Sequence, residues 1–240
     1  MSDDRPPTVT PPFEGTVSGE AAAATDSADL DDPTVSTDSA DPDDSVRVGG
    51  VLLAAGTSDR FGDENKLLAT VDGEPIVRRA ARTLVAAEVE PIVVVVGHEA
   101  DRVRDAVADL PIEVVLNDAY EAGQSTSVRA GIGALSAADV DVDAAVVALG
   151  DMPFVAPATV ETLVAAYVAG AGDALAAAHE GVRGNPVLFD RRFFDRLAAV
   201  EGDVGGRAIL LNSPASALVA VDDPGVRRDI DRPADLPGDR

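Results

Sequence analysis

The sequence contains no cysteine, no tryptophan and only two histidines, and aromatic residues make up 3% of the chain. The absence of cysteine excludes disulfide bonds and thiolate metal sites, and it is typical of proteins from a reducing compartment. No apolar run approaches the roughly 20 residues that a membrane-spanning helix requires. The first residues also lack the basic start and apolar core of a signal peptide. We therefore expect a soluble, cytoplasmic protein.

Basic residues are scarce, and lysine is almost absent. The chain has 43 acidic and 19 basic residues, of which only Lys66 is a lysine, and its formal net charge is −24. This charge disfavours binding to nucleic acid or to an anionic membrane, so we expect neither as a partner. An acidic, lysine-poor surface is typical of adaptation to high salt, although a GC-rich genome also replaces lysine by arginine. Under both explanations, Lys66 is the one position where lysine was retained.

The first 45 residues differ in composition from the remainder. They contain twelve acidic residues and one arginine, with frequent Pro, Ser, Thr and Ala and almost no large apolar side chains. Ordering such a segment costs conformational entropy that burial does not offset. We predict a disordered acidic tail over residues 1–45 and one globular domain over residues 46–240. A domain of about 195 residues buries roughly 70% of its unfolded surface, which suffices for a self-contained core.

Short apolar runs alternate with helical patterns over most of this domain. Strands are expected near residues 48–54, 91–97, 112–116, 144–149, 174–178, 186–189 and 217–221. Helices are expected near residues 74–88, 99–109, 125–135, 158–168, 191–200 and 206–211. Continuous apolar strands that alternate with helices indicate a parallel sheet covered on both faces. The predicted fold class is α/β: a single three-layer αβα, Rossmann-like domain with a mostly parallel sheet, preceded by the disordered acidic tail.

A glycine-rich loop follows the first expected strand and reads LAAGTSDRFGDENK from Leu53 to Lys66. In open α/β sheets, ligands bind outside the carboxyl ends of the strands, where this loop begins. Its backbone N–H groups can approach phosphate oxygens while Arg60 and Lys66 neutralise their charge. The loop is neither a Walker A motif nor a Rossmann fingerprint, because five residues separate Gly56 from Gly62 and no GxGxxG occurs. A flexible surface loop is the alternative interpretation.

The loop resembles the signature LAAGxSxRxGxxK of the molybdenum cofactor nucleotidyltransferases, with one additional residue before Lys66. Other segments resemble the same family in the same order. They are NDAYEAGQSTSVRAGI from residue 117, LGDMP from 149, RGNPVLFD from 183, GDVGGRAILL from 202 and DIDRPADL from 229. The resemblance extends from Val48 to Leu236. It implies an αβα fold with CTP or GTP as donor and molybdopterin as acceptor, and it leaves room for a molybdenum enzyme as recipient.

The resemblance also implies roles for particular residues. Asp151 and Asp231 would bind Mg²⁺, which takes one or two carboxylates together with phosphate oxygens. Arg60 and Lys66 would act with Asp151 in catalysis by neutralising charge on the triphosphate and on the departing pyrophosphate. The nucleotide-binding set is Leu53, Ala54, Ala55, Gly56, Lys66, Asn117, Gly123, Ser125 and Ser127, and the acceptor-binding set is Arg183 and Asn185.

Several of these residues have a purely structural alternative. Asp151 could cap a helix or a turn, and Arg60 could be an ordinary surface residue. Ser125 could cap the helix that it begins. The surroundings of Asp231 are rich in aspartate, and Asp229 could take its place.

Three functions agree with the motifs. The first is transfer of CMP from CTP to molybdopterin with release of pyrophosphate, favoured by Ala55 where the resembling guanylyl enzymes usually have glycine. The second is guanylyl or other nucleotidyl transfer, to molybdopterin or to a sugar or polyol phosphate. The third is a non-catalytic nucleotide-binding chaperone of a molybdenum enzyme. Such a chaperone would be expected to have lost Lys66, Asp151 or Asp231, and all three are present.

Overall fold

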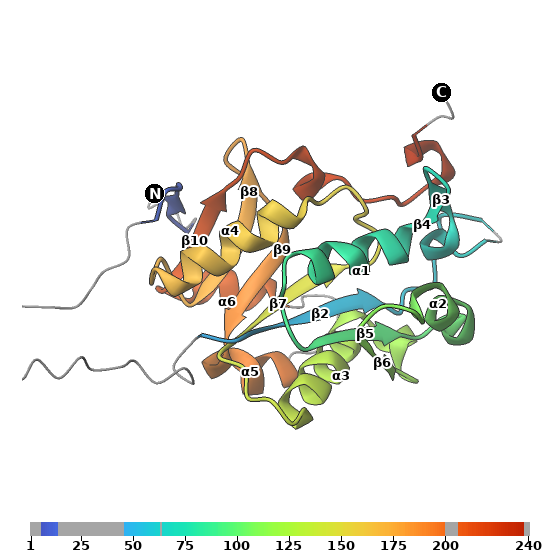
Figure 1. Ribbon diagram of the computed structural model, residues 1–240, viewed down its shortest axis with the longest axis horizontal. Coiled ribbons are helices and arrows are strands. Elements are labelled where there is room, and N and C mark those ends of the chain that lie inside the picture. The colour runs from blue at the N-terminus through green and yellow to red at the C-terminus, as the bar shows by residue number, and fades with distance from the viewer. Residues whose placement is uncertain (1–5, 14–45, 63, 200–205, 238–240) are drawn as a thin grey trace, which may run out of the picture.

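The computed structural model describes residues 6–13, 46–62, 64–199 and 206–237. Its main element is an eight-stranded sheet with the order β1-β10-β8-β9-β7-β2-β5-β6 (Figure 1). All neighbouring strands are parallel except β9, which runs antiparallel to β7 and β8. The prediction of a mostly parallel sheet is therefore confirmed.

The elements follow the predicted alternation of strands and helices. The strands of the sheet are β1 (Thr8–Val9), β2 (Val48–Ala54), β5 (Ile92–Val96), β6 (Glu113–Leu116), β7 (Ala144–Leu149), β8 (Ala174–His179), β9 (Val182–Asp190) and β10 (Ser216–Ala220), and β3 (Thr70–Val71) and β4 (Glu74–Pro75) form a separate hairpin. The α-helices are α1 (Ile76–Ala86), α2 (Ala100–Val107), α3 (Gln124–Ala137), α4 (Pro157–Val168), α5 (Phe194–Ala198) and α6 (Arg207–Asn212). Short 3-10 helices are η1 (Lys66–Leu68), η2 (Tyr120–Ala122), η3 (Arg191–Phe193), η5 (Pro224–Arg227) and η6 (Pro233–Asp235). Among the described helices, none combines the length and the apolar character needed to cross a membrane.

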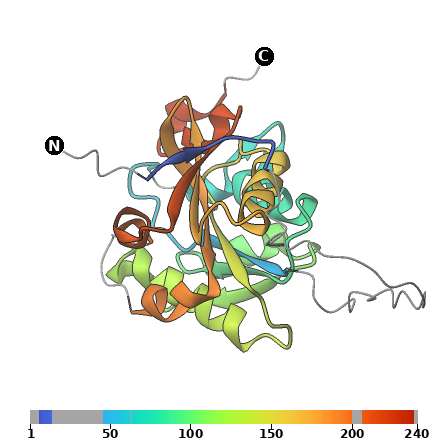
Figure 2. The ribbon, with the colours of Figure 1, turned by 90° about the vertical axis from the view of Figure 1, so that its left-hand side faces the viewer.

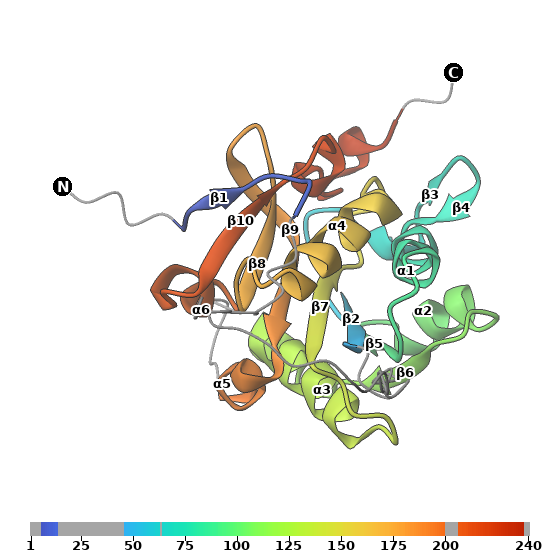
Figure 3. The same ribbon diagram turned by 60° about the vertical axis from the view of Figure 1, so that its left-hand side comes forward.

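Helices cover both faces of the sheet, so the predicted three-layer αβα arrangement is also confirmed. Helices α1, α2 and α4 lie on one face, and α3, α5 and α6 lie on the other (Figure 3). The central strand β2 is buried along its whole length. Its residues alternate between the two cores: Leu52 belongs to the cluster under α1 and α4, and Val51 belongs to the cluster under α3. This two-sided burial explains why the strand reads as a continuous apolar run.

Strand β9 is longer than the sequence indicates, and its first residues reach the end of the sheet where the parallel strands terminate. The expected strand covered residues 186–189, whereas β9 begins at Val182. The Arg-Gly-Asn stretch at its start has low β propensity, and it pairs with β8 through Ala178 and Arg183 after an irregularity in the register. Because β9 is antiparallel to β8, its amino-terminal residues lie beside the carboxyl ends of the parallel strands.

Eight residues of the expected tail belong to the fold. Strand β1 adds to the edge of the sheet in parallel with β10, where the backbone N–H of Leu218 donates to the carbonyl of Pro7 at 2.7 Å (Figure 2). Val9 and Phe13 pack against the core cluster under α1 and α4. The expectation of disorder over residues 1–45 does not hold for residues 6–13, because these two apolar side chains anchor a segment whose average composition is polar. Residues 1–5 and 14–45 lie outside the described residues.

Val9→Asp is expected to lower the free energy of unfolding by about 1–2 kcal/mol, because a charge would replace a side chain that packs on the core. Thr8 is exposed on the opposite face of the same strand. Thr8→Asp is therefore the matched control, with an expected change below about 0.5 kcal/mol. Urea denaturation measures both variants, and identical midpoints for the two would show that β1 contributes nothing to stability.

Candidate active site

Four charged side chains meet beyond the carboxyl ends of β2 and β7. The ammonium Nζ of Lys66 lies 2.7 Å from Oδ2 of Asp151 and 2.9 Å from Oδ1 of Asp231. On the outer side, Nη1 of Arg60 lies 2.6 Å from Oδ2 of Asp231. These are the residues predicted for catalysis and metal binding, and the structure brings all four together although Arg60 and Asp231 are 171 positions apart in the sequence.

Lys66 is directed into this cluster by a compact turn built around Asn65. The side chain of Asn65 is buried and accepts hydrogen bonds from the hydroxyl of Ser58 at 3.3 Å and from the backbone N–H of Leu67 at 3.0 Å. The Ser58 hydroxyl in turn accepts the backbone N–H of Lys66 at 3.2 Å. Asn65 thus caps the 3-10 helix η1 that begins at Lys66. These hydrogen bonds hold the described part of the loop in place, so it is not the loose surface segment of the alternative interpretation.

Asp151 and Asp231 are placed side by side by one backbone contact between distant parts of the chain. Asp151 follows β7, and the backbone N–H of Ile230 donates to its carbonyl at 2.9 Å. The side chain of Ile230 is fully buried in a small apolar cluster with Phe61 and Ile76. This anchoring fixes the C-terminal segment so that Asp231, two residues after Asp229, presents its carboxylate to Lys66.

The ion pairs keep the cluster charged. Burial alone would lower the pKa of Lys66, but the attraction and hydrogen bonds of Asp151 and Asp231 outweigh it, and the pKa is raised. The hydrogen bond from Lys66 lowers the pKa of Asp231 against the opposing effect of burial, and the nearby Arg60 adds to this lowering. Both shifts favour the charged forms, so Lys66 is cationic and Asp231 anionic throughout the neutral range.

The two carboxylates fit a divalent cation that is also held by phosphate. Oδ1 of Asp151 is buried and has no hydrogen-bond partner among the described residues, whereas Oδ2 accepts from Lys66. A buried carboxylate oxygen without a partner is costly, and a cation is the ligand that would satisfy it. The described ranges contain no group of three or more His, Cys, Asp or Glu arranged to hold a metal ion. Two carboxylates with nucleotide phosphate completing the ligand set therefore fit better than a site made by protein alone.

A cavity of about 190 Å³ opens beside the charged cluster. Its lining includes six of the residues predicted to bind nucleotide, together with Asp151. Tyr120 and Gln124 also line it, and sequence reasoning missed both. Gln124 is the first residue of α3, directly after the predicted Gly123, so the signal for it was its place at a helix start facing the loop. The full lining is Leu53, Ala54, Ala55, Gly56, Lys66, Leu67, Tyr120, Gln124, Ser127, Leu149 and Asp151.

Three predicted nucleotide-binding residues, Asn117, Gly123 and Ser125, do not line this cavity. The amide Nδ2 of Asn117 donates to Thr126 Oγ1 at 2.9 Å and to Ser127 Oγ at 3.0 Å. Gly123 has a φ of 110°, a conformation that favours glycine, and it directly precedes α3. Ser125 is buried in the first turn of α3. In this structure Asn117 links the first turn of α3 to the end of β5, where its backbone N–H donates to the carbonyl of Val96 at 2.8 Å.

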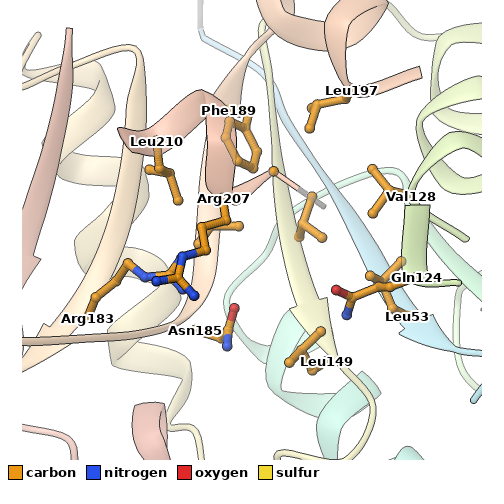
Figure 4. Close-up of a pocket in the computed structure, with 13 residues that line it drawn as sticks. Leu53, Gln124, Val128, Leu149, Arg183, Asn185, Phe189, Leu197, Arg207 and Leu210 are labelled. Atoms are coloured by element: carbon orange, nitrogen blue, oxygen red, sulfur yellow. The ribbon is translucent and has the colours of Figure 1, made fainter. Parts of the chain in front are cut away.

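A second cavity, of about 240 Å³, adjoins the first, and three residues line both: Leu53, Gln124 and Leu149. Arg183 and Asn185, predicted on the acceptor side, lie in it at the start of β9 (Figure 4). Arg207 on the first turn of α6 reaches into the same cavity, and sequence reasoning missed it although it lies in the segment GDVGGRAILL. The remaining lining is mostly apolar: Val128, Val147, Val187, Phe189, Leu197, Gly206 and Leu210.

Known proteins resemble this chain over most of its length. A family model of the MobA-like NTP transferase domain matches residues 50–228. The nicotine blue oxidoreductase of Paenarthrobacter nicotinovorans is 30% identical over 191 residues, which cover 77% of this chain and 92% of that protein. The bifunctional protein GlmU of Kineococcus radiotolerans is 36% identical over 129 residues, which cover 52% of this chain and 26% of GlmU. This chain therefore matches about a quarter of GlmU.

Solved structures agree with this family. The crystal structure of Rv0371c from Mycobacterium tuberculosis is similar with a TM-score of 0.68 and 26% identity, covering 79% of this chain and 95% of that one. A crystal structure of Rv0371c in complex with manganese is similar with a TM-score of 0.66 and 27% identity, covering 79% of this chain and 96% of that one. The matched family model, the relatives and the fold together show that the chain belongs to the MobA-like NTP transferase family and is a nucleotidyltransferase.

Proposed function

We propose that the protein transfers CMP from CTP to molybdopterin, with Mg²⁺ as cofactor and release of pyrophosphate. The observation that carries this proposal is the contact of Lys66 with both Asp151 and Asp231 at the mouth of the loop-lined cavity. A cation beside a pair of carboxylates is the arrangement that a metal-bound triphosphate requires. The same cluster argues against the non-catalytic chaperone, because binding a nucleotide without reacting it does not need all three residues.

The chain's own residues supply positioning and charge. Lys66 and Arg60 would neutralise the phosphates of the donor as negative charge accumulates on the departing pyrophosphate. Mg²⁺, held by Asp151 and Asp231, would add to that neutralisation and align the triphosphate. The phosphate of the acceptor attacks the α-phosphorus of CTP while the bond to pyrophosphate breaks. A phosphate monoester is already ionised near neutral pH, so no residue has to act as a general base.

Ala55 supports CTP over GTP as the donor. Its side chain is buried at the cavity wall, and a Cβ added to Gly97 would lie 2.8 Å from the methyl of Ala55 and 2.7 Å from Cβ of Tyr120. Gly97 thus allows Tyr120 and Ala55 to approach closely and narrow the cavity. A glycine at position 55 would widen it. One methyl group gives only about 1–3 kcal/mol of discrimination between two ligands, here CTP and GTP. Guanylyl transfer therefore stays the second candidate.

The name of one relative introduces a different kind of activity. The protein from Paenarthrobacter nicotinovorans is an oxidoreductase by name, at 30% identity. In this chain the cluster of Lys66, Asp151 and Asp231 favours phosphoryl chemistry. A compact ammonium can neutralise phosphate oxygens, and two carboxylates can hold the Mg²⁺ that binds a triphosphate. We therefore place nucleotidyl transfer first for this protein.

Thermal-shift screening of the four nucleoside triphosphates with Mg²⁺ is expected to give the largest rise in melting temperature for CTP, because a ligand that binds only the folded state stabilises it. Transfer itself is then tested by measuring pyrophosphate release from CTP in the presence and in the absence of molybdopterin. Release only in the presence of molybdopterin would support the proposal. CTP binding without release would favour a non-catalytic role, and a larger shift with GTP would overturn the choice of donor.

A further inference from the structure

Two arginines face each other in the second cavity. Arg183 comes from the start of β9 and Arg207 from the first turn of α6, and their guanidinium ends lie together beside Asn185 (Figure 4). Burial, and then the positive charge of Arg207, lower the pKa of Arg183. Within the residues that the structure describes, neither guanidinium forms an ion pair with a carboxylate.

The absence of a carboxylate partner separates Arg183 and Arg207 from the arginines of the described residues that lie in ion pairs. The chain has 43 acidic residues, and arginines elsewhere on the fold do pair with them. Arg78 pairs with Asp109, and Arg192 pairs with Asp173 at 2.6 Å and with Asp190 at 3.0 Å. Two like charges held close together raise the energy of the folded state unless an anion offsets them, and the partial burial of Arg183 adds to this cost. The arrangement therefore selects for an anionic ligand between Arg183 and Arg207.

The geometry points to an anion with two charges. Each guanidinium presents a planar fork of N–H donors that matches two oxygens of a phosphate group, and two forks together match a dianion. The side-chain amide of Asn185 lies next to them as a further polar group. Elsewhere in the lining of this cavity, Val128, Leu197 and Phe189 offer an apolar surface for a small organic body. A free inorganic anion would leave that surface unused.

We propose that Arg207 and Arg183 together form a binding site for the dianionic phosphate group of a small acceptor molecule, with Arg207 as a specificity-determining residue. The assignment of this ligand as the acceptor rests on the proposed nucleotidyl transfer, because the cavity meets the nucleotide cavity at Leu53, Gln124 and Leu149. The binding of a phosphate monoester does not itself depend on transfer. A second phosphate pKa of about 6 makes the dianion dominant at neutral pH, so affinity should fall as the pH drops below that value.

Phenyl phosphate is a suitable probe, because it combines a dianionic phosphate with a small apolar ring, and benzoate is its singly charged counterpart. Isothermal titration of the full chain at pH 7.5 is expected to show phenyl phosphate binding at least ~10-fold tighter than benzoate, from the additional charge-assisted hydrogen bonds. Arg207→Gln is expected to lower the affinity for phenyl phosphate by ~10-fold or more. Arg207 is exposed, so this variant is expected to fold, and its melting temperature verifies that.

Arg104→Gln is the matched control. It removes the same charge from an exposed ion pair with Asp101 on α2, away from both cavities. Phenyl phosphate affinity is expected to be unchanged in this variant. Equal weakening in Arg104→Gln and Arg207→Gln would mean that only overall charge matters, and it would overturn the site. The same conclusion would follow if wild-type protein binds phenyl phosphate no better than benzoate.

CTP binding in the presence of Mg²⁺ separates this inference from the proposed function. In Arg207→Gln the thermal shift with CTP is expected to equal that of the wild type, because Arg207 does not line the nucleotide cavity. If CTP binds normally and the affinity for phenyl phosphate does not depend on Arg207, the inference is overturned and the proposed function is unaffected. Arg207-dependent phenyl phosphate binding without CTP binding would overturn the proposed function and leave the anion site in place.

Discussion

Asp151→Asn is expected to lower the rate of pyrophosphate release by about 100-fold or more, because it removes a charged metal ligand where negative charge develops. The structure adds a second reason. Oδ1 of Asp151 is buried and has no hydrogen-bond partner among the described residues, so binding a cation is the role that best explains this oxygen, and asparagine would bind a cation less well. An asparagine can still accept the hydrogen bond from Lys66. Replacing the charged acceptor of this hydrogen bond by a neutral one is expected to cost about 1 kcal/mol of unfolding free energy, which would lower the melting temperature by only about 2–4 °C.

The comparison for this variant is Asp141→Asn, which makes the same chemical change in an exposed ion pair with Arg191. Steady-state pyrophosphate release at saturating Mg²⁺ should be normal in Asp141→Asn and strongly reduced in Asp151→Asn. Normal turnover in Asp151→Asn would mean that the metal is held elsewhere. The parallel change Asp231→Asn should also lower turnover, whereas Asp229→Asn should not, because Asp231 is the residue that contacts Lys66.

Lys66→Arg is expected to lose most activity, by about 10-fold or more, although it keeps the positive charge. The side chain of Lys66 is only 14% exposed, and its single nitrogen lies within 3 Å of carboxylates on two separate segments. A planar guanidinium is wider and cannot occupy the same point between them. Because the arginine can still pair with at least one carboxylate, stability is expected to change by no more than about 1 kcal/mol.

Arg104→Lys provides the complementary control for the lysine prediction. It exchanges the same two residue types in reverse order at an exposed site, and it should affect neither turnover nor melting temperature. Turnover at the wild-type level in Lys66→Arg would show that the lone lysine reflects composition and not chemistry. In that event the placement of the triphosphate beside Lys66 would have to be abandoned.

The sequence was most informative where burial imposes a simple pattern. The strand at Val48–Ala54 is covered on both faces, so its uninterrupted apolar run predicted its position and its parallel environment. The same run located the loop that carries Lys66. Asp151 could be placed at an edge of the sheet because it directly follows another buried strand.

The sequence was least informative where position depends on distant contacts. Strand β1 is held by Val9 and Phe13 within a polar segment, and two apolar side chains do not produce a readable period. Arg207 lines the second cavity only because α6 packs against β8 and β10, and the residues around Arg207 in the sequence do not predict this packing. The choice between Asp229 and Asp231 depended on the backbone bond from Ile230 to Asp151, which no spacing rule supplies.

The reversed direction of β9 has a consequence for how substrate preference can diverge. Arg183 and Asn185 belong to a strand, and Arg183 pairs with Ala178 of β8. Insertions and deletions there would disturb the sheet, whereas exchange of a side chain would not. If these two residues bind the acceptor, as proposed above, descendants of this protein should acquire new acceptors through point substitutions at positions 183 and 185. A mutant library aimed at new acceptors should accordingly exchange side chains at these two positions and keep the length of β9 unchanged.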